Sequence, residues 1–202
     1  MLKIGVTGGI GAGKSLVCRV FSALGVPVYN SDKEAQRIMD CDRQLQRLLE
    51  DAFGKEVIKG GMPDRRALAG KVFGNPGALE RLNGIVHPAV RRDFISWAEK
   101  QGDVPYIVKE AAILFETGIY AGLDTVLLVT APRHQRLKRI MERDGESAAG
   151  IRKRMQSQWP DERKIPLAGV VIKNDNSRGM LALILKLHNE FSTGCLPEGM
   201  KK

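Results

Sequence analysis

Short apolar runs alternate with longer amphipathic stretches along the chain. The runs have the length of buried strands and occupy residues 4–6, 26–29, 106–108, 125–129 and 170–172. Between them apolar residues recur every three or four positions, as in helices, the last of which spans 180–191. Buried strands that alternate with helices are typical of a parallel sheet. The pattern predicts an α/β fold with a five-stranded parallel sheet, in which Pro27 favours an edge position for its strand.

One gap between the apolar runs is too long for a simple crossover. A parallel connection needs only about a dozen residues, whereas more than seventy separate the second run from the third. Helical patterns at 35–53, 68–73 and 79–97 predict an extra helical subdomain over 32–103. Within it, the pair His87–Pro88 is expected to begin a helix, and a histidine beside proline is more often a structural hydrogen-bonding residue than a catalyst.

A second insertion lies between the fourth and fifth runs. Helical patterns at 133–143 and 148–158 are joined by the turn dipeptide Asp144–Gly145. With the insertions removed, residues 1–31, 104–132 and 165–191 remain as the core. Residues 192–202 are polar, contain glycine and proline, and are expected to form a flexible tail.

Composition limits the class of protein. The chain has 202 residues, of which 43% are hydrophobic and 27% charged, as in an ordinary soluble domain. No stretch is apolar enough to span a bilayer, and the start of the chain lacks the pattern of a signal peptide, so we expect a cytoplasmic protein. The three cysteines Cys18, Cys41 and Cys195 form no CxxC pair and are expected to be reduced thiols.

The net charge of +9 is concentrated in one segment. Residues 133–164 contain ten Lys or Arg and five Asp or Glu, a net +5. This basic segment suits a polyanionic small substrate as well as it suits DNA, although a solvated helix face is the better explanation for most of these charges. Aromatic residues make up only 5% of the chain and do not interleave with the basic ones, so the sequence does not indicate a nucleic-acid or membrane partner.

Residues 8–15 read GGIGAGKS and match the phosphate-loop spacing GxxxxGKS in full, directly after the first apolar run. Glycines allow backbone conformations in which successive N–H groups point at phosphate oxygens. Lys14 supplies a charge for the β and γ phosphates, and Ser15 supplies a hydroxyl for Mg²⁺. The motif predicts a nucleoside triphosphate site, and the basic segment 133–164 is then interpreted as a lid that excludes water.

Acidic residues follow two of the predicted strands. Ser31 and Glu34 fit a capping box, which places Asp32 in the first turn of a helix. There Asp32 is suited either to act as base or hydrogen-bond acceptor for an acceptor hydroxyl or only to complement the helix dipole. Glu110 follows the third run and is suited either to hold Mg²⁺ through water or to be an exposed acid at a strand end.

In combination these features resemble the dephospho-CoA kinase family along the whole chain. The specific parts are the GGIGAGKS loop and the segment LFETG at 114–118. The other matching positions are Asp32, Pro63, Asp64, Arg65, Leu68, Val72, Phe73, residues 85–90, residues 135–137, Arg139, residues 143–145, Gln158, Pro160, residues 170–172 and Asn174.

The resemblance implies a P-loop NTPase-like three-layer core, with 32–103 as the acceptor-binding insertion and 133–164 as the lid. It implies transfer of the ATP γ-phosphoryl group to the 3′-hydroxyl of dephospho-CoA, with Mg²⁺ as cofactor. The implied catalytic residues are Asp32, Lys14, Arg139 and Arg143. The implied nucleotide-binding residues are Gly8, Gly9, Gly11, Ala12, Gly13, Lys14, Ser15, Leu16 and Asn174. Asp32, Arg65 and His87 are implied on the acceptor side, and Ser15 and Glu110 at the metal.

The chain departs from the family pattern at a few positions. The family usually has Asp and then Val-Pro where this chain has Glu, Ala and Ala at 110–112, so the acid is kept with a longer arm and the proline bend is lost. It also usually has Ala-Asp where this chain has Ala168 and Gly169, and Asp at Lys173. The departures weaken inferences near Gly169 and Lys173 but leave the phosphate loop and Asp32 untouched.

Other functions share the phosphate loop. Another small-molecule or nucleoside monophosphate kinase would differ mainly in the acceptor insertion, and substrate assays separate the two. A GTPase switch is disfavoured because residues 173–175 read KND, the wrong order for a guanine-reading [NT]KxD motif. An ATPase motor is disfavoured by the short chain, with no second phosphate loop or repeat. We expect a monomer or a weak homo-oligomer.

Overall fold

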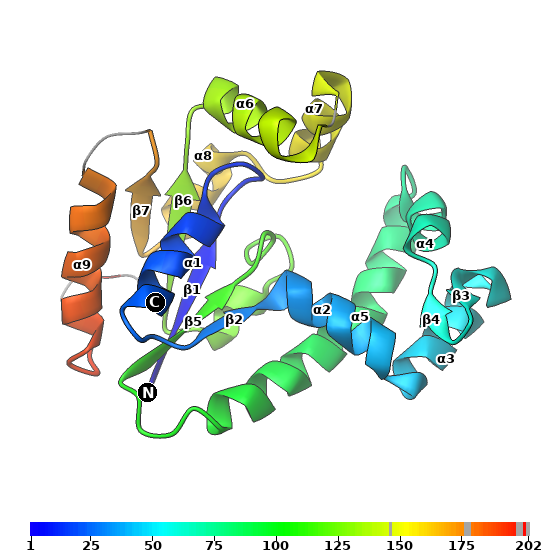
Figure 1. Cartoon of the computed structure of the whole chain (residues 1–202), viewed down its shortest axis with the longest axis horizontal. Helices are drawn as coiled ribbons and strands as arrows, with labels where there is room; N and C mark the ends of the chain where they lie inside the picture. Colours follow the sequence, from blue (N-terminus) through cyan, green and yellow to red (C-terminus); the bar gives the residue numbers. More distant parts are fainter. Residues whose placement is uncertain (146, 176–178, 197–199, 201–202) are drawn as a thin grey trace. The chain divides into compact units, whose positions relative to one another are not determined.

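The structure is a computed structural model that describes residues 1–145, 147–175, 179–196 and 200. The chain forms two compact units (Figure 1). Residues Met1–Asn30 and Gln101–Lys202 form the core unit, and Ser31–Lys100 form the insertion unit. Residues 133–164 belong to the core unit, and their role as a lid stays a prediction.

The core unit contains a five-stranded sheet in the order β2-β5-β1-β6-β7, with every neighbouring pair parallel. The strands are β1 (Leu2–Thr7), β2 (Val28–Asn30), β5 (Tyr106–Glu110), β6 (Thr125–Thr130) and β7 (Val170–Lys173). The predicted five-stranded parallel α/β fold is confirmed, and β2 lies at an edge as Pro27 suggested. This strand begins two residues later than predicted, because Pro27 has no N–H to donate and only its carbonyl joins the ladder, accepting from Val108 N at 2.9 Å.

Helices α1 and α9 cover one face of the sheet (Figure 1). The helical elements of the core unit are α1 (Lys14–Ala23), η2 (Ile119–Gly122), α6 (Arg133–Asp144), α7 (Ala148–Gln156), α8 (Asp161–Lys164), η3 (Ile165–Leu167) and α9 (Gly179–Phe191). Gly145 ends α6 in the left-handed conformation, as expected for the predicted turn. On the other face, Leu114 and Phe115 pack with Val126 and Leu128. The strands are therefore buried on both sides, which explains their continuous apolar runs.

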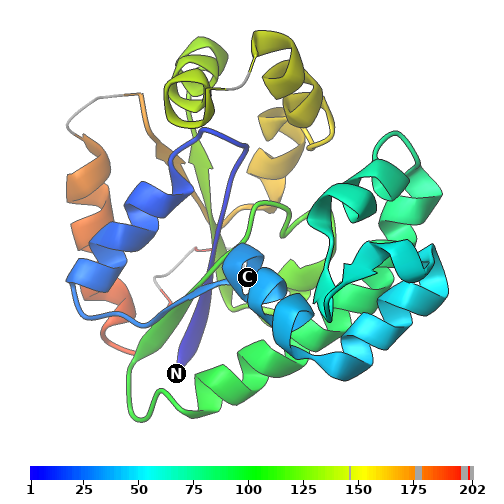
Figure 2. The same cartoon turned by 45° about the vertical axis from the view of Figure 1, so that its right-hand side comes forward.

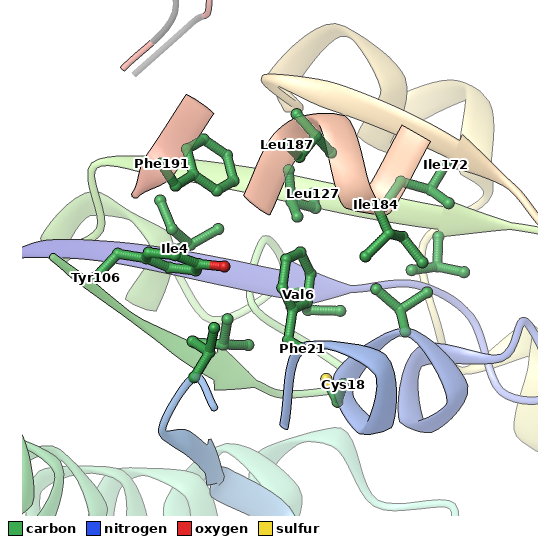
Figure 3. Close-up of a cluster of buried hydrophobic side chains, with 14 of the residues drawn as sticks. Ile4, Val6, Cys18, Phe21, Tyr106, Leu127, Ile172, Ile184, Leu187 and Phe191 are labelled. Carbon is green, nitrogen blue, oxygen red and sulfur yellow. The ribbon is translucent and has the colours of Figure 1, made fainter. Parts of the chain in front are cut away.

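Figure 3 shows how the main core joins these layers. Ile4 and Val6 of β1 have no exposed surface and lie among side chains of α1 and α9. Phe21 of α1 and Phe191 of α9 both pack edge-on against Tyr106, with ring centroids 6.1 and 5.4 Å away. This packing fixes β1 and α1, the two elements that flank the phosphate loop.

The insertion unit is mainly helical. Its elements are α2 (Ser31–Cys41), α3 (Arg43–Phe53), η1 (Lys55–Val57), β3 (Ile58–Lys59), β4 (Met62–Pro63), α4 (Arg65–Val72) and α5 (Pro76–Glu99). Asp42, Asp64 and Asn75 cap α3, α4 and α5 through their side-chain oxygens. The hairpin β3–β4 beside α2 turns at Gly60 and Gly61, which have φ of 58° and 76° (Figure 2). Its two-residue strands are too short to give a periodic signal, so the sequence did not predict them.

Two local predictions in the insertion unit are wrong. His87 and Pro88 do not begin a helix but lie inside α5. Proline cannot donate to the carbonyl four residues earlier, and that residue is Gly84, whose backbone is the least restricted. Ser31 does not form a capping box: its buried Oγ has no hydrogen-bond partner among the described residues, and the Glu34 carboxylate accepts from Arg37 instead.

The predicted flexible tail, 192–202, lies partly outside the described residues. Where it is described, Ser192 Oγ donates to His188 O at 2.7 Å and Thr193 Oγ1 donates to Glu190 O at 2.7 Å. Leu196 and Met200 are half-buried against the main core. Two apolar side chains of this polar segment thus pack against the main core, and the flexibility of the tail stays a prediction.

Candidate nucleotide-binding site

The phosphate loop connects β1 to α1, and its glycines are required by shape. Gly8, Gly11 and Gly13 have φ of 152°, 77° and 102°, values that other residues rarely adopt. A Cβ on Gly8 would lie 2.2 Å from Val129 O, and one on Gly13 would lie 2.0 Å from Asn174 Nδ2. The loop is thus folded tightly against the ends of β6 and β7.

The start of α1 is arranged for an anion. Gly13 makes no side-chain cap, and the first turn contains no acidic residue, so the positive end of the helix is not neutralised there. Lys14 Nζ donates to Gly8 O at 3.0 Å and so lies across the loop. The amides of Ala12 and Leu16, both predicted to contact nucleotide, donate to Gly9 O and Gly13 O at 3.0 Å.

Glu110 is buried beside Ser15 at the carboxyl ends of the strands. It is 5% exposed, so the alternative of an exposed acid at a strand end is wrong. Ser15 Oγ donates to Glu110 Oε1 at 2.9 Å, and Asn30 Nδ2 donates to Oε2 at 2.7 Å. Burial, followed by the charge of Glu110, raises the pKa of the Cys18 thiol. The structure therefore brings both predicted metal-side residues together and keeps the neighbouring thiol protonated.

Asn174, predicted to bind nucleotide, supports the loop from behind. It is 7% exposed, and its Nδ2 donates to Ala12 O at 2.8 Å. Its own carbonyl accepts from Arg139 Nη2 at 3.2 Å, and Arg139 also donates to Gln135 Oε1 at 3.2 Å. Arg139 therefore contacts Asn174, which in turn contacts the phosphate loop.

Arg143 lies in a different setting from Arg139. Its exposed guanidinium forms a forked pair with Asp144, with Nε to Oδ1 at 2.6 Å and Nη2 to Oδ2 at 2.9 Å. Arg154 approaches the same carboxylate at 3.6 Å. The structure thus separates the two predicted lid arginines by their partners, with only Arg139 bonded to a residue that holds the loop.

Two residues that contact the loop were not predicted to act on it. Arg136 Nε donates to Ile10 O at 2.9 Å, and Gln158 Oε1 accepts from Ile10 N at 2.8 Å. A Cβ on Gly9 would lie 1.9 Å from Arg136 Nη2. Arg136 Nη1 also lies 3.5 Å from Asp161 Oδ2, and burial raises the pKa of Asp161 while the arginine charge opposes this shift. No local pattern reports such contacts, since the partners are more than a hundred residues apart.

The predicted acceptor-side residues belong to the insertion unit. Asp32 is exposed in the first turn of α2. Gln36 and Asp40 follow it at helical spacing on the same face, and Arg65 binds both, at 3.1 Å to Gln36 Oε1 and 2.7 Å to Asp40 Oδ2. The structure therefore places Arg65 on the helix face that carries Asp32. His87 is half-buried in α5, which packs against α2.

The phosphate loop, the lysine and serine that follow it and the parallel sheet define a P-loop protein of the kinase type. Comparison with known proteins gives the family. The family model of dephospho-CoA kinase matches residues 2–179. The chain therefore belongs to the dephospho-CoA kinase family, and it is a kinase.

Individual relatives agree over nearly the full length. A dephospho-CoA kinase of Bacteroides fragilis is 38% identical over 186 residues, which cover 92% of this chain and 91% of the relative. The crystal structure of TT1252 from Thermus thermophilus has a TM-score of 0.82 at 37% identity, covering 92% and 94% of the two chains. The dephospho-CoA kinase from Campylobacter jejuni has a TM-score of 0.68 at 30% identity, covering 95% and 98%.

Proposed function

We propose that this protein transfers the γ-phosphoryl group of ATP to the 3′-hydroxyl of dephospho-CoA, giving CoA and ADP in the last step of CoA biosynthesis. The observation that carries the proposal is a complete phosphate loop, closed by required glycines, in a chain that matches the dephospho-CoA kinase family over residues 2–179. Phosphoryl transfer needs mainly positioning and charge stabilisation, and the residues below are assigned on that basis.

The triphosphate is assigned to the loop amides, Lys14 and the start of α1. Lys14 now bonds to a loop carbonyl, so its ammonium already points across the cradle and can exchange that oxygen for phosphate oxygens. Asn174 holds Ala12 and packs on Gly13. We therefore assign Asn174 to the support of the loop in addition to its predicted place at the nucleotide.

Ser15 at the start of α1 and Glu110 at the end of β5 fit Mg²⁺. Ser15 Oγ and the Glu110 carboxylate are oxygen ligands, the type that Mg²⁺ prefers, and Asn30 orients the carboxylate. Among the described residues no three His, Cys, Asp or Glu side chains are grouped as a metal site, which agrees with an ion that also takes ligands from phosphates and water. We assign Ser15 to direct binding and Glu110 to binding through water. Bound Mg²⁺ would neutralise charge on the β and γ phosphates.

We assign Asp32 as the acid–base residue for the acceptor. Its carboxylate would accept the proton of the 3′-hydroxyl as the oxygen attacks phosphorus, and the leaving group is ADP. Asp32 follows Asn30 by two residues, a span of at most roughly 7 Å, and Asn30 bonds to Glu110. Arg65 and His87 are assigned to binding of dephospho-CoA, and Arg139 and Arg143 to the transferring phosphates. For Arg143 this requires release from Asp144.

The test is ADP release, measured in parallel with dephospho-CoA, with AMP and without acceptor. Among the three assays, we expect rapid release only in the one that contains dephospho-CoA. Lys14→Ala should show no release there, because the change removes the ammonium assigned to the phosphates. Turnover with AMP but not with dephospho-CoA would instead support a nucleoside monophosphate kinase.

We further propose a cytoplasmic enzyme that is a monomer or a weak homo-oligomer. All three cysteines are free thiols, as is typical of a reducing compartment. Among the described residues, none of the helices is both long and apolar enough to cross a bilayer. Light scattering across a range of protein concentrations measures the oligomeric state.

A further inference from the structure

Ile10 is held from outside the phosphate loop at both of its backbone polar groups. Its carbonyl accepts from Arg136 Nε of α6 at 2.9 Å, and its N–H donates to Gln158 Oε1 beyond α7 at 2.8 Å. Arg136 and Gln158 lie 126 and 148 positions along the chain from Ile10. Both belong to the basic segment 133–164, within the core unit.

These two bonds fix two peptide planes. In a planar trans peptide the N–H and the C=O point in opposite directions. Gln158 holds the plane between Gly9 and Ile10, and the Gly9 carbonyl on its other side accepts from Ala12 N at 3.0 Å. Arg136 holds the plane between Ile10 and Gly11, so the Gly11 N–H must point away from the arginine. Because Gly11 has φ of 77°, its backbone would otherwise have wide freedom.

We propose that Arg136 and Gln158 are positioning residues that preset the phosphate loop for the triphosphate. This inference rests on the proposed function only for the identity of the nucleotide, ATP. Arg136 and Gln158 act through Ile10, and the loop amides so aligned lose less conformational entropy when the nucleotide binds. The same proposal explains why position 9 is a glycine. The φ of Gly9 is not positive, so its backbone does not require glycine. A Cβ there would lie 1.9 Å from Arg136 Nη2 and would displace the guanidinium.

The test is a double-mutant cycle on ATP affinity, measured by calorimetry without acceptor. We expect Arg136→Ala and Gly9→Ala each to raise the Kd about tenfold, and the double variant to be no weaker than either single one, since both remove the same bond. The matched control is Arg133→Ala, which deletes an exposed arginine from the same helix and should change Kd less than twofold. The proposal would be overturned if the double variant raised the Kd for ATP by the product of the two single effects. It would also be overturned if Arg133→Ala raised the Kd as much as Arg136→Ala.

A second measurement separates positioning from folding. Arg136 and Gln158 line a cavity of about 560 Å³, which is large enough to admit a guanidinium ion once the side chain is removed. Millimolar guanidinium chloride should restore at least half of the lost affinity of Arg136→Ala, whereas equimolar potassium chloride should not. If guanidinium restored the affinity of Gln158→Ala as much as that of Arg136→Ala, the guanidinium group would not be the positioning group. The same conclusion would follow if a folded Arg136→Ala protein showed no rescue. Because ATP binding is read without acceptor, the result does not depend on turnover of dephospho-CoA.

Discussion

Replacing Lys164 by methionine should strongly destabilise the core unit. Lys164 has no exposed surface, and its Nζ lies 2.7 Å from Oε1 of Glu116, which is 12% exposed. Methionine keeps much of the side-chain volume but leaves the largely buried Glu116 carboxylate without its cationic partner. Removing one member of a buried pair costs about 3–5 kcal/mol, or roughly 6–20 °C in Tm for a chain of this size.

The assay is urea unfolding followed by tryptophan fluorescence. Trp159 serves as a reporter because its backbone N–H donates to the same Glu116 oxygen at 3.1 Å. Lys186→Met is the matched control, since Lys186 pairs with Glu190 at 3.8 Å and is 72% exposed. It should change the free energy of unfolding by less than about 1 kcal/mol. Lys164→Met combined with Glu116→Gln should recover most of the loss. A single Lys164→Met protein as stable as the control would refute the reasoning.

Three further outcomes follow from the site. Asp32→Asn should leave the Kd for ATP nearly unchanged while lowering kcat about 10²-fold or more. Turnover at the wild-type rate would show that Asp32 only complements the helix dipole. Glu110→Gln should raise the Mg²⁺ concentration needed for half-maximal activity several-fold with little change at saturating metal, and an unchanged Mg²⁺ dependence would remove Glu110 from the metal site. Because burial raises the pKa of Cys18, moving from pH 7 to pH 9 should not expose a thiolate there, so a thiol reagent should label the exposed Cys41 and Cys195 and reach Cys18 only after unfolding.

The sequence predicted the parts of the molecule that are encoded locally. Five buried strands show as apolar runs because both faces of the sheet are covered, and the phosphate loop shows as a motif because Gly8 and Gly13 fit only without a Cβ. The pairing of Ser15 with Glu110 also follows from parallel strands whose carboxyl ends meet at one edge.

The remaining features depend on contacts between distant residues. Arg136 and Gln158 reach Ile10 through bonds to the backbone, which leave no residue pattern at Ile10 itself. Pro88 was expected to begin a helix because local rules disfavour it inside one, but α5 continues through it while packing against α2 and α3. In both cases tertiary packing decided what local chemistry left open.

The strand order has a consequence for how the protein is made. β1 pairs with β5 and β6, and β2 pairs with β5. Neither β1 nor β2 can therefore pair until the strands that follow the insertion unit have been synthesised. During synthesis at roughly 5–20 residues per second, the ribosome must therefore release Ser31–Lys100 before any ladder of the sheet can close. The nascent insertion unit has the opportunity to fold first, and the nucleotide cradle, translated earlier, matures after it.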